Sequence, residues 1–264
     1  MSERVQLTID NAVATVRLSR PDKLNGLDPD MFEGLISTGE RIIADNGIRA
    51  VVLHGEGKGF CAGLDFASFM GSPDLMQKLL ARGEESLANM AQRAAWVWQE
   101  VKVPVIAAVH GVAFGGGLQI ALGADLRYVT TDARLSVMEI KWGLIPDMSI
   151  TQTLLRLVPI DVAKELTFTG RIFSGAEAVE LGLATKVSDD PLADALETAK
   201  LIASKSPHAI RAGKTLLNDA PGMSRADALR LETELQIPLL GSPNQTEAVQ
   251  ANMMKREPVF KDPE

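Results

Sequence analysis

Two stretches of the sequence share one plan, in which an apolar run ends in a His-Gly pair and continues into a glycine-containing loop. They read VVLHGEGKGFCAGLD at residues 51–65 and VIAAVHGVAFGGGLQ at residues 105–119. Short runs rich in valine and isoleucine are typical of buried strands, and glycines after them are typical of tight loops. The two stretches therefore predict two related strand–loop–helix units, which restricts the chain to an α/β fold.

Other strand-like runs surround these units. They read VQLTI at 5–9, AVATVRL at 12–18 and DLRYVTTDARLSV at 125–137. Between the two units, apolar residues from Leu87 to Val101 recur at helical spacing before Pro104, which predicts a helix. This part of the chain alternates strands with helices, as an α/β domain does.

After about residue 147 the sequence is mostly helical. Amphipathic patterns predict helices over 192–205, 221–236 and 245–256. The capping-box spacing of Ser174 with Glu177, and of Asn244 with Glu247, predicts that helices begin there. We therefore divide the chain into an α/β core of residues 1–205 and a C-terminal helical region of residues 206–264.

Composition excludes several classes of protein. The 264 residues are 46% hydrophobic and 23% charged, as in an ordinary globular protein, and the formal net charge of −7 argues against nucleic-acid or anionic membrane partners. The single cysteine, Cys61, excludes an intrachain disulfide, and no Cys/His spacing indicates a metal site. We see no signal-peptide pattern and no membrane-spanning run, so we expect a cytosolic protein without a bound metal.

The common glycine-rich nucleotide motifs do not fit. The glycines at 115–117 lack the G-x-G-x-x-G spacing, because Gln119 and Ile120 follow. Gly213, Lys214 and Thr215 resemble the end of a P-loop, but its first glycine position is His208. No G-x-S-x-G nucleophile motif occurs. Glycines 115–117 instead either allow close packing of a helix on a sheet or bring backbone N–H groups up to a developing oxyanion.

Several segments together resemble the crotonase family, also called the enoyl-CoA hydratase/isomerase superfamily. They are GKGFCAGLDF at 57–66, the stretch from His110 to Ser149, SRPDKLNGLDPDMFEGL near the start, TGRIFSGAEAVELGLATKV at 169–187 and KREPVFKD at 255–262. The resemblance covers nearly the whole chain. It implies a crotonase-like spiral of ββα units with a C-terminal helical trimerisation region, in a homotrimer or a dimer of trimers.

The resemblance also implies an oxyanion hole that binds an acyl-CoA thioester carbonyl. The two donors correspond to the backbone N–H groups of Ala62 and Gly116, with Gly63 beside them. Cys61 corresponds to a packing residue of the family rather than to a nucleophile. Such a pair of donors would stabilise the enolate that forms when an alpha proton leaves.

Proton transfer at such a site needs a titratable side chain. Hydratases of the family use two glutamates, and here Glu139 matches the second while Gln119 occupies the position of the first. An amide does not exchange a proton near neutral pH, although it can orient a water or bind substrate. Asp147, eight residues after Glu139, matches an aspartate of the dienoyl-CoA isomerase branch and is a candidate second acid; its alternative role is to cap a helix.

The resemblance places coenzyme A, which is part of the substrate rather than a bound cofactor, along three segments. Their residues are Lys23, Leu24 and Leu27; Leu64, Asp65 and Phe66; and, from a neighbouring subunit, Lys255, Phe260 and Lys261. The sequence thus predicts an enoyl-CoA hydratase/isomerase with Glu139 as general acid/base. The alternatives are another crotonase-type reaction, such as thioester hydrolysis or decarboxylation, and an acyl-CoA-binding protein that has lost efficient catalysis with its first glutamate.

Overall fold

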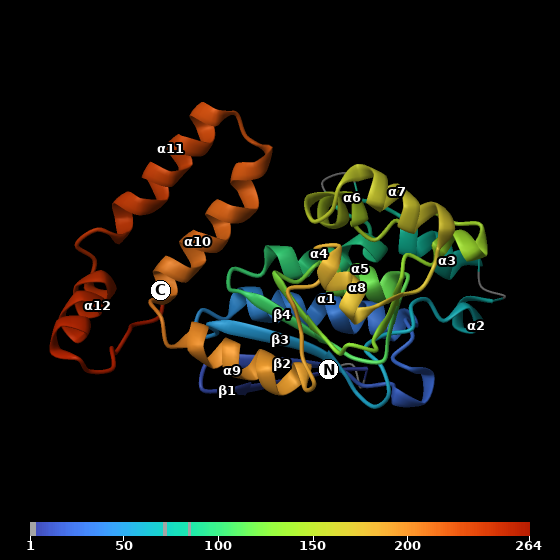
Figure 1. The fold of residues 1–264 in the computed structure, drawn as a ribbon, viewed down its shortest axis with the longest axis horizontal. Helices are drawn as coiled ribbons and strands as arrows, with labels where there is room; N and C mark the ends of the chain where they lie inside the picture. The colour runs from blue at the N-terminus through green and yellow to red at the C-terminus, as the bar shows by residue number, and fades with distance from the viewer. Residues whose placement is uncertain (1–3, 71–72, 84–85) are drawn as a thin grey trace.

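A six-stranded sheet forms the centre of the fold (Figure 1). The structure is a computed structural model, and it describes residues 4–70, 73–83 and 86–264. The strand order is β1-β2-β3-β4-β6-β9; β1 and β2 are antiparallel, and the later neighbours are parallel. These strands are β1 Val5–Asp10, β2 Val13–Leu18, β3 Ala50–Gly55, β4 Val105–Val109, β6 Leu126–Val129 and β9 Lys186–Val187.

A smaller sheet continues from the end of β4. Its strands are β5 Val112–Phe114, β7 Arg134–Ser136 and β8 Phe173–Ser174, in the order β5-β7-β8. β5 is parallel to β7, and β7 is antiparallel to β8. The 105–119 stretch therefore supplies one strand to each sheet before its helix begins.

Helices cover both faces of the large sheet. In β3, Val51 and Leu53 belong to the main core with helices α1 (Pro29–Ala44) and α4 (Met90–Glu100). Ala50 and Val52 pack in a second cluster with Ala195 and other residues of helix α9 (Pro191–Ala203). Figure 1 shows α9 on one side of the strands and α1 and α4 on the other. Burial on both faces explains why β3 and β4 are continuous apolar runs rather than alternating ones.

The helices lie between the strands and after the last one. The N-terminal ones are α1 Pro29–Ala44, α2 Phe66–Phe69, α3 Pro73–Leu80, α4 Met90–Glu100 and α5 Gly116–Leu122; the later ones are α6 Ile150–Thr153, α7 Ile160–Thr169, α8 Gly175–Glu180, α9 Pro191–Ala203, α10 Pro207–Asp219, α11 Arg225–Gln236 and α12 Pro243–Met254. Single 3₁₀ turns are η1 Pro21–Lys23, η2 Glu139–Trp142, η3 Leu154–Arg156, η4 Ala220–Gly222 and η5 Ile237–Leu239. Ser174 caps α8 by accepting from the Glu177 N–H, which confirms that predicted start.

Two helix predictions were wrong. α12 begins at Pro243, because the Ser242 side chain accepts from the Gln245 N–H and proline suits the first helical position. Asn244 therefore lies inside the helix and does not cap it. α4 begins only at Met90, because Asn89 and Gln92 form a capping box there, so Leu87 lies outside the helix and is exposed.

The C-terminal helices α10 to α12 extend away from the sheet (Figure 1). The sequence missed α10, although Ser206-Pro207 is a helix-start signal. Its buried Lys214 Nζ donates to the carbonyl oxygens of Trp98 and Val103 at 3.2 and 3.0 Å and pairs with Asp125 at 2.8 Å. These bonds attach α10 to the core, and a domain boundary at residue 205 stays a prediction.

Candidate active site

The loops of the two related stretches lie side by side. The Cys61 N–H donates to the Val112 carbonyl oxygen, and the Phe114 N–H donates to the Cys61 carbonyl oxygen, both at 3.0 Å. A Cβ atom placed on Gly63 would lie 2.5 Å from the carbonyl oxygen of Phe114 and 3.6 Å from the nitrogen of Gly116. The loop after β3, residues 56–65, therefore reaches the N-terminus of α5, and the two together form one site.

Glycines 115 to 117 are closely packed against neighbouring groups, and they begin helix α5. A Cβ on Gly117 would lie 2.3 Å from the Cys61 carbonyl oxygen, so this glycine allows α5 to pack against the loop. Gly115 has a φ of +51°, which favours glycine, and a Cβ there would lie 3.1 Å from Glu139 Oε1. Gly116 is the first residue of α5, so its backbone N–H has no acceptor within the helix.

The structure corrects one of the two predicted oxyanion donors. The Ala62 N–H donates to the Leu24 carbonyl oxygen at 2.9 Å, so it is not available to a ligand. Two residues on, the Leu64 N–H has no hydrogen-bond acceptor among the described residues, and the same holds for the Gly116 N–H. Leu64 and Gly116 both line the same cavity. Leu64 and Gly116, rather than Ala62 and Gly116, are therefore the donors that the geometry favours, and we call residues 56–65 the oxyanion loop.

Glu139 and Gln119 are in direct contact at this cavity. The η2 turn places Glu139 so that its Oε1 accepts from Gln119 Nε2 at 2.6 Å. Gln119 Oε1 in turn accepts from the Met148 N–H at 2.8 Å. The other carboxylate oxygen of Glu139, Oε2, is buried without a hydrogen-bond partner among the described residues. Glu139 therefore has one oxygen fixed by the protein and one oxygen free for a ligand.

Burial changes the acidity of three groups in the site. It raises the pKa of Glu139, and the nearby charge of Asp147 adds to that effect. Burial likewise raises the pKa of Asp147. It raises the pKa of the Cys61 thiol to about 12, which keeps the thiol protonated and excludes a thiolate nucleophile at neutral pH. The site thus holds two carboxyl groups that accept and release protons more readily near neutral pH than exposed ones do.

The cavity has a volume of about 510 Å³ and is mostly apolar. Glu139 and Asp147 line it together with Ala62, Gly63, Leu64, Phe66 and Gly116, all of which the sequence singled out. The sequence missed most of its apolar wall, which comes from separate elements: Phe32, Met76, Leu79, Leu80, Ala91, Phe114, Met138, Trp142, Leu144, Ile145 and Met148. The rings of Phe66 and Trp142 lie 4.6 Å apart, so the end of the oxyanion loop and the η2 turn meet there.

Other predicted coenzyme A residues support the loop instead of lining this cavity. Leu27 is fully buried; its N–H donates to the Gly63 carbonyl oxygen, and its own carbonyl oxygen accepts from the Asp65 N–H. The Asp65 carboxylate pairs with Arg20 at 2.7 Å, and hydrogen bonding from Ser68 and then Arg20 lowers its pKa. Lys23 is exposed, and it does not line the cavity. The segment around Leu24 and Leu27 therefore fixes the conformation of the oxyanion loop.

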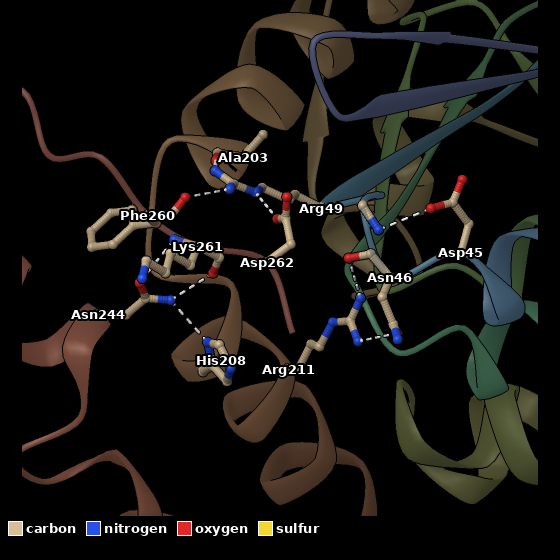
Figure 2. A network of polar contacts seen from close by, with 11 residues as sticks. Asp45, Asn46, Arg49, Ala203, His208, Arg211, Asn244, Phe260, Lys261 and Asp262 are labelled. Carbon is tan, nitrogen blue, oxygen red and sulfur yellow. Dashed lines mark hydrogen bonds and ion pairs between the residues drawn. The ribbon is translucent and has the colours of Figure 1, made fainter. Parts of the chain in front are cut away.

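The C-terminal tail lies far from the cavity of its own chain. It lies beside α9 and α10, whereas α2 and α3 lie at the other end of the sheet (Figure 1). Figure 2 shows that Arg49 donates to the Phe260 carbonyl oxygen and pairs with Asp262, and that Asn244 bonds both backbone groups of Lys261. Asn244 also contacts His208 at 2.9 Å. A contribution of Lys255, Phe260 and Lys261 to a neighbouring subunit's site stays a prediction.

A poorly solvated carboxylate beside two free backbone N–H donors is typical of an enzyme that transfers protons next to a carbonyl group. Comparison with known proteins agrees: the family model described as Enoyl-CoA hydratase/isomerase matches residues 8–263. The chain belongs to this family, which is the crotonase superfamily, and it is an enzyme of the enoyl-CoA hydratase/isomerase type.

A hydratase and an isomerase are both similar to this chain over nearly its whole length. A probable enoyl-CoA hydratase of Bacillus subtilis is 33% identical over 97% of this chain and 98% of its own length. A peroxisomal Delta(3,5)-Delta(2,4)-dienoyl-CoA isomerase of Arabidopsis thaliana is 32% identical over 98% and 96%. The crystal structure of an enoyl-CoA hydratase from Bacillus anthracis superposes with a TM-score of 0.90 at 29% identity, over 98% and 99% of the two chains. The predicted crotonase-like α/β fold is thereby confirmed.

Within the described residues, no helix is both long enough and apolar enough to span a membrane. Trimeric assembly and a cytosolic location stay predictions.

Proposed function

We propose that this enzyme shifts a carbon–carbon double bond in enoyl-CoA thioesters through an enolate, with Glu139 as the proton carrier. The observation that carries the proposal is the free Oε2 atom of Glu139, which is buried at a cavity lined also by Leu64 and Gly116. Among the described residues that line the cavity, no other group combines a raised pKa with this position next to the N-terminus of α5. The second carboxyl group, Asp147, lies in the segment after η2.

The reaction would proceed in two proton transfers. The thioester oxygen accepts hydrogen bonds from the Leu64 and Gly116 N–H groups, which stabilises negative charge on it. Glu139 removes a proton from C2 of a 3-enoyl thioester, and the electron pair of the C–H bond spreads over the oxygen, C2 and C4. Glu139 returns the proton to C4, so the double bond lies between C2 and C3, and no atom is gained or lost.

Asp147 extends this chemistry to longer conjugated substrates. In a 3,5-dienoyl thioester the negative charge reaches C6, and a second acid can protonate that carbon. Asp147 lines the same cavity as Glu139, and its raised pKa favours the protonated form that such an acid needs. The similarity to a Delta(3,5)-Delta(2,4)-dienoyl-CoA isomerase supports this interpretation. Coenzyme A enters as part of the substrate.

Hydration is the less favoured reaction. Gln119 cannot act as an acid or a base, and both ends of its amide are occupied by Glu139 and Met148. Gln119 is also almost fully buried and does not line the cavity, so it is not placed to orient a water molecule there for hydration, hydrolysis or decarboxylation.

Three substrates distinguish the possibilities. We expect a 3-enoyl-CoA and a 3,5-dienoyl-CoA to gain the absorbance of a conjugated thioester, and crotonyl-CoA to keep its absorbance. Loss of the crotonyl-CoA signal at a comparable rate would indicate a hydratase instead. Binding of all three esters without any reaction would indicate the acyl-CoA-binding alternative. Glu139→Gln should slow isomerisation by about 10²–10⁴-fold, whereas the control Glu165→Gln, at an exposed ion pair with Arg171, should not slow it.

A further inference from the structure

Gln119 is a buried amide that connects two parts of the active site. It lies in α5, and 1% of its surface is exposed. Its Nε2 donates to Glu139 Oε1 at 2.6 Å, and its Oε1 accepts from the Met148 N–H at 2.8 Å. It therefore joins the proposed base to the turn that carries Asp147, the residue before Met148.

The two bonds require a donor and an acceptor on one side chain. An ionised glutamate could accept from Met148 but could not donate to Glu139. Methionine has a similar length, but it would leave Glu139 Oε1 and the Met148 N–H without these bonds. Asparagine is one methylene shorter. Among side chains of this length, glutamine satisfies both neighbours without a proton that it can lose near neutral pH.

The charges that face Glu139 are few. Asp147 is the ionisable group whose charge acts on it, and α5 contributes none, because its sequence is GGLQIAL. On the oxyanion loop, Asp65 is paired with Arg20, and the Cys61 thiol is neutral. The amide of Gln119 is thus the neighbour that fixes Glu139 without adding charge to it.

We infer that Gln119 is a positioning residue, which holds one oxygen of Glu139 so that the other oxygen alone faces the substrate. The inference rests on the proposed proton transfer by Glu139. It differs from the two roles that the sequence left open for this amide, orienting a water or binding the substrate. In the structure both ends of the amide bind protein groups instead. Gln119 therefore acts on the reaction through Glu139.

Two variants of Gln119 test the inference through kinetics and their dependence on pH. Gln119→Met releases Glu139, so kcat should fall by about 100-fold while KM changes little, because a misplaced base slows chemistry rather than binding. Gln119→Glu places two carboxyl groups at 2.6 Å, where they share one proton. The rise of kcat/KM with pH should therefore move to higher pH in this variant. The control Gln99→Met removes a 2.7 Å bond to the Gly123 carbonyl oxygen beyond the other end of α5, and it should leave both properties unchanged.

A second readout separates this inference from the proposed isomerisation. Proton removal from C2 is also measured by exchange of the alpha protons of butyryl-CoA in heavy water, followed by NMR. If the wild-type enzyme exchanges these protons but isomerises no enoyl-CoA, the proposed function fails, and a slower exchange in Gln119→Met still supports the inference. Wild-type exchange rates and an unchanged pH profile in both Gln119 variants would overturn it. A fall in binding with unchanged kcat would also overturn it, since that would make Gln119 a substrate ligand.

Discussion

Replacing Glu139 by glutamine should make the folded protein more stable while it removes activity. The Oε2 atom of the Glu139 carboxylate is buried and has no hydrogen-bond partner among the described residues, so the ionised form is poorly solvated in the folded state. The amide introduced by Glu139→Gln would keep the bond from Gln119 and remove the charge, but its NH₂ would still lack a partner. We therefore expect a gain of about 1 kcal/mol, because a buried group without a partner costs more when it is charged than when it is neutral.

The pH dependence of this gain has a definite sign. Burial raises the pKa of Glu139 in the folded state above its unfolded value, so ionisation opposes folding. This destabilisation of the wild type is absent below the unfolded pKa, where Glu139 is protonated in both states. It is complete above the folded pKa, where Glu139 is ionised in both states. The stability difference between the variant and the wild type should accordingly appear as the pH rises from about 4 to neutral.

Thermal unfolding followed by circular dichroism measures the effect at matched protein concentration. At neutral pH the variant should unfold about 2–4 °C higher, and at about pH 4 the two midpoints should converge. The control Glu165→Gln, at an exposed carboxylate paired with Arg171, should show no gain. A variant that is equally stable or less stable at neutral pH would refute the description of Glu139 as an ionised, poorly solvated carboxylate. Activity should fall by about 10²–10⁴-fold, the usual contribution of a general acid–base group.

Four further substitutions test other parts of the structure. Asp147→Asn should slow isomerisation of a 3,5-dienoyl-CoA by about 100-fold and of a 3-enoyl-CoA by less, as steady-state assays of both substrates would reveal. Gln119→Glu should raise the rate of crotonyl-CoA hydration, because it restores a second acid; no increase would show that the carboxylate was not limiting. Gly117→Ala should lower the free energy of unfolding in urea by about 1–3 kcal/mol, because its Cβ would lie 2.3 Å from the Cys61 carbonyl oxygen. The control Gly213→Ala has open space around its Cβ and should stabilise α10 by about 0.5–1 kcal/mol. Lys214→Met should cost about 3–5 kcal/mol in the same assay, because it leaves Asp125 without its buried partner.

The oxyanion loop shows how much of the site could be predicted from the sequence. The glycines and the family resemblance indicated the loop and the helix that meet at the cavity, because glycine is required wherever backbones approach closely. They did not determine which N–H of the loop is free. The Leu24 carbonyl oxygen, from a segment 38 residues away, occupies the Ala62 N–H and leaves that of Leu64 open. Neighbouring backbone donors are chemically equivalent in sequence, so only the approach of another segment distinguishes them.

Sequence by itself determined the features that depend on local chemistry and on recognisable motifs. The strands β3 and β4, the start of α8 at Ser174, the loop glycines and the position of Glu139 all belong to this group. The tertiary structure decided which groups became partners across the chain. Gln119 lies 20 residues from Glu139 and 29 from Met148, yet it bonds both, and Asn244 bonds the tail at Lys261 instead of capping its own helix. The reason is physical: a side chain's propensity is set by its own chemistry, but its hydrogen-bond partners and its desolvation depend on which segments pack around it.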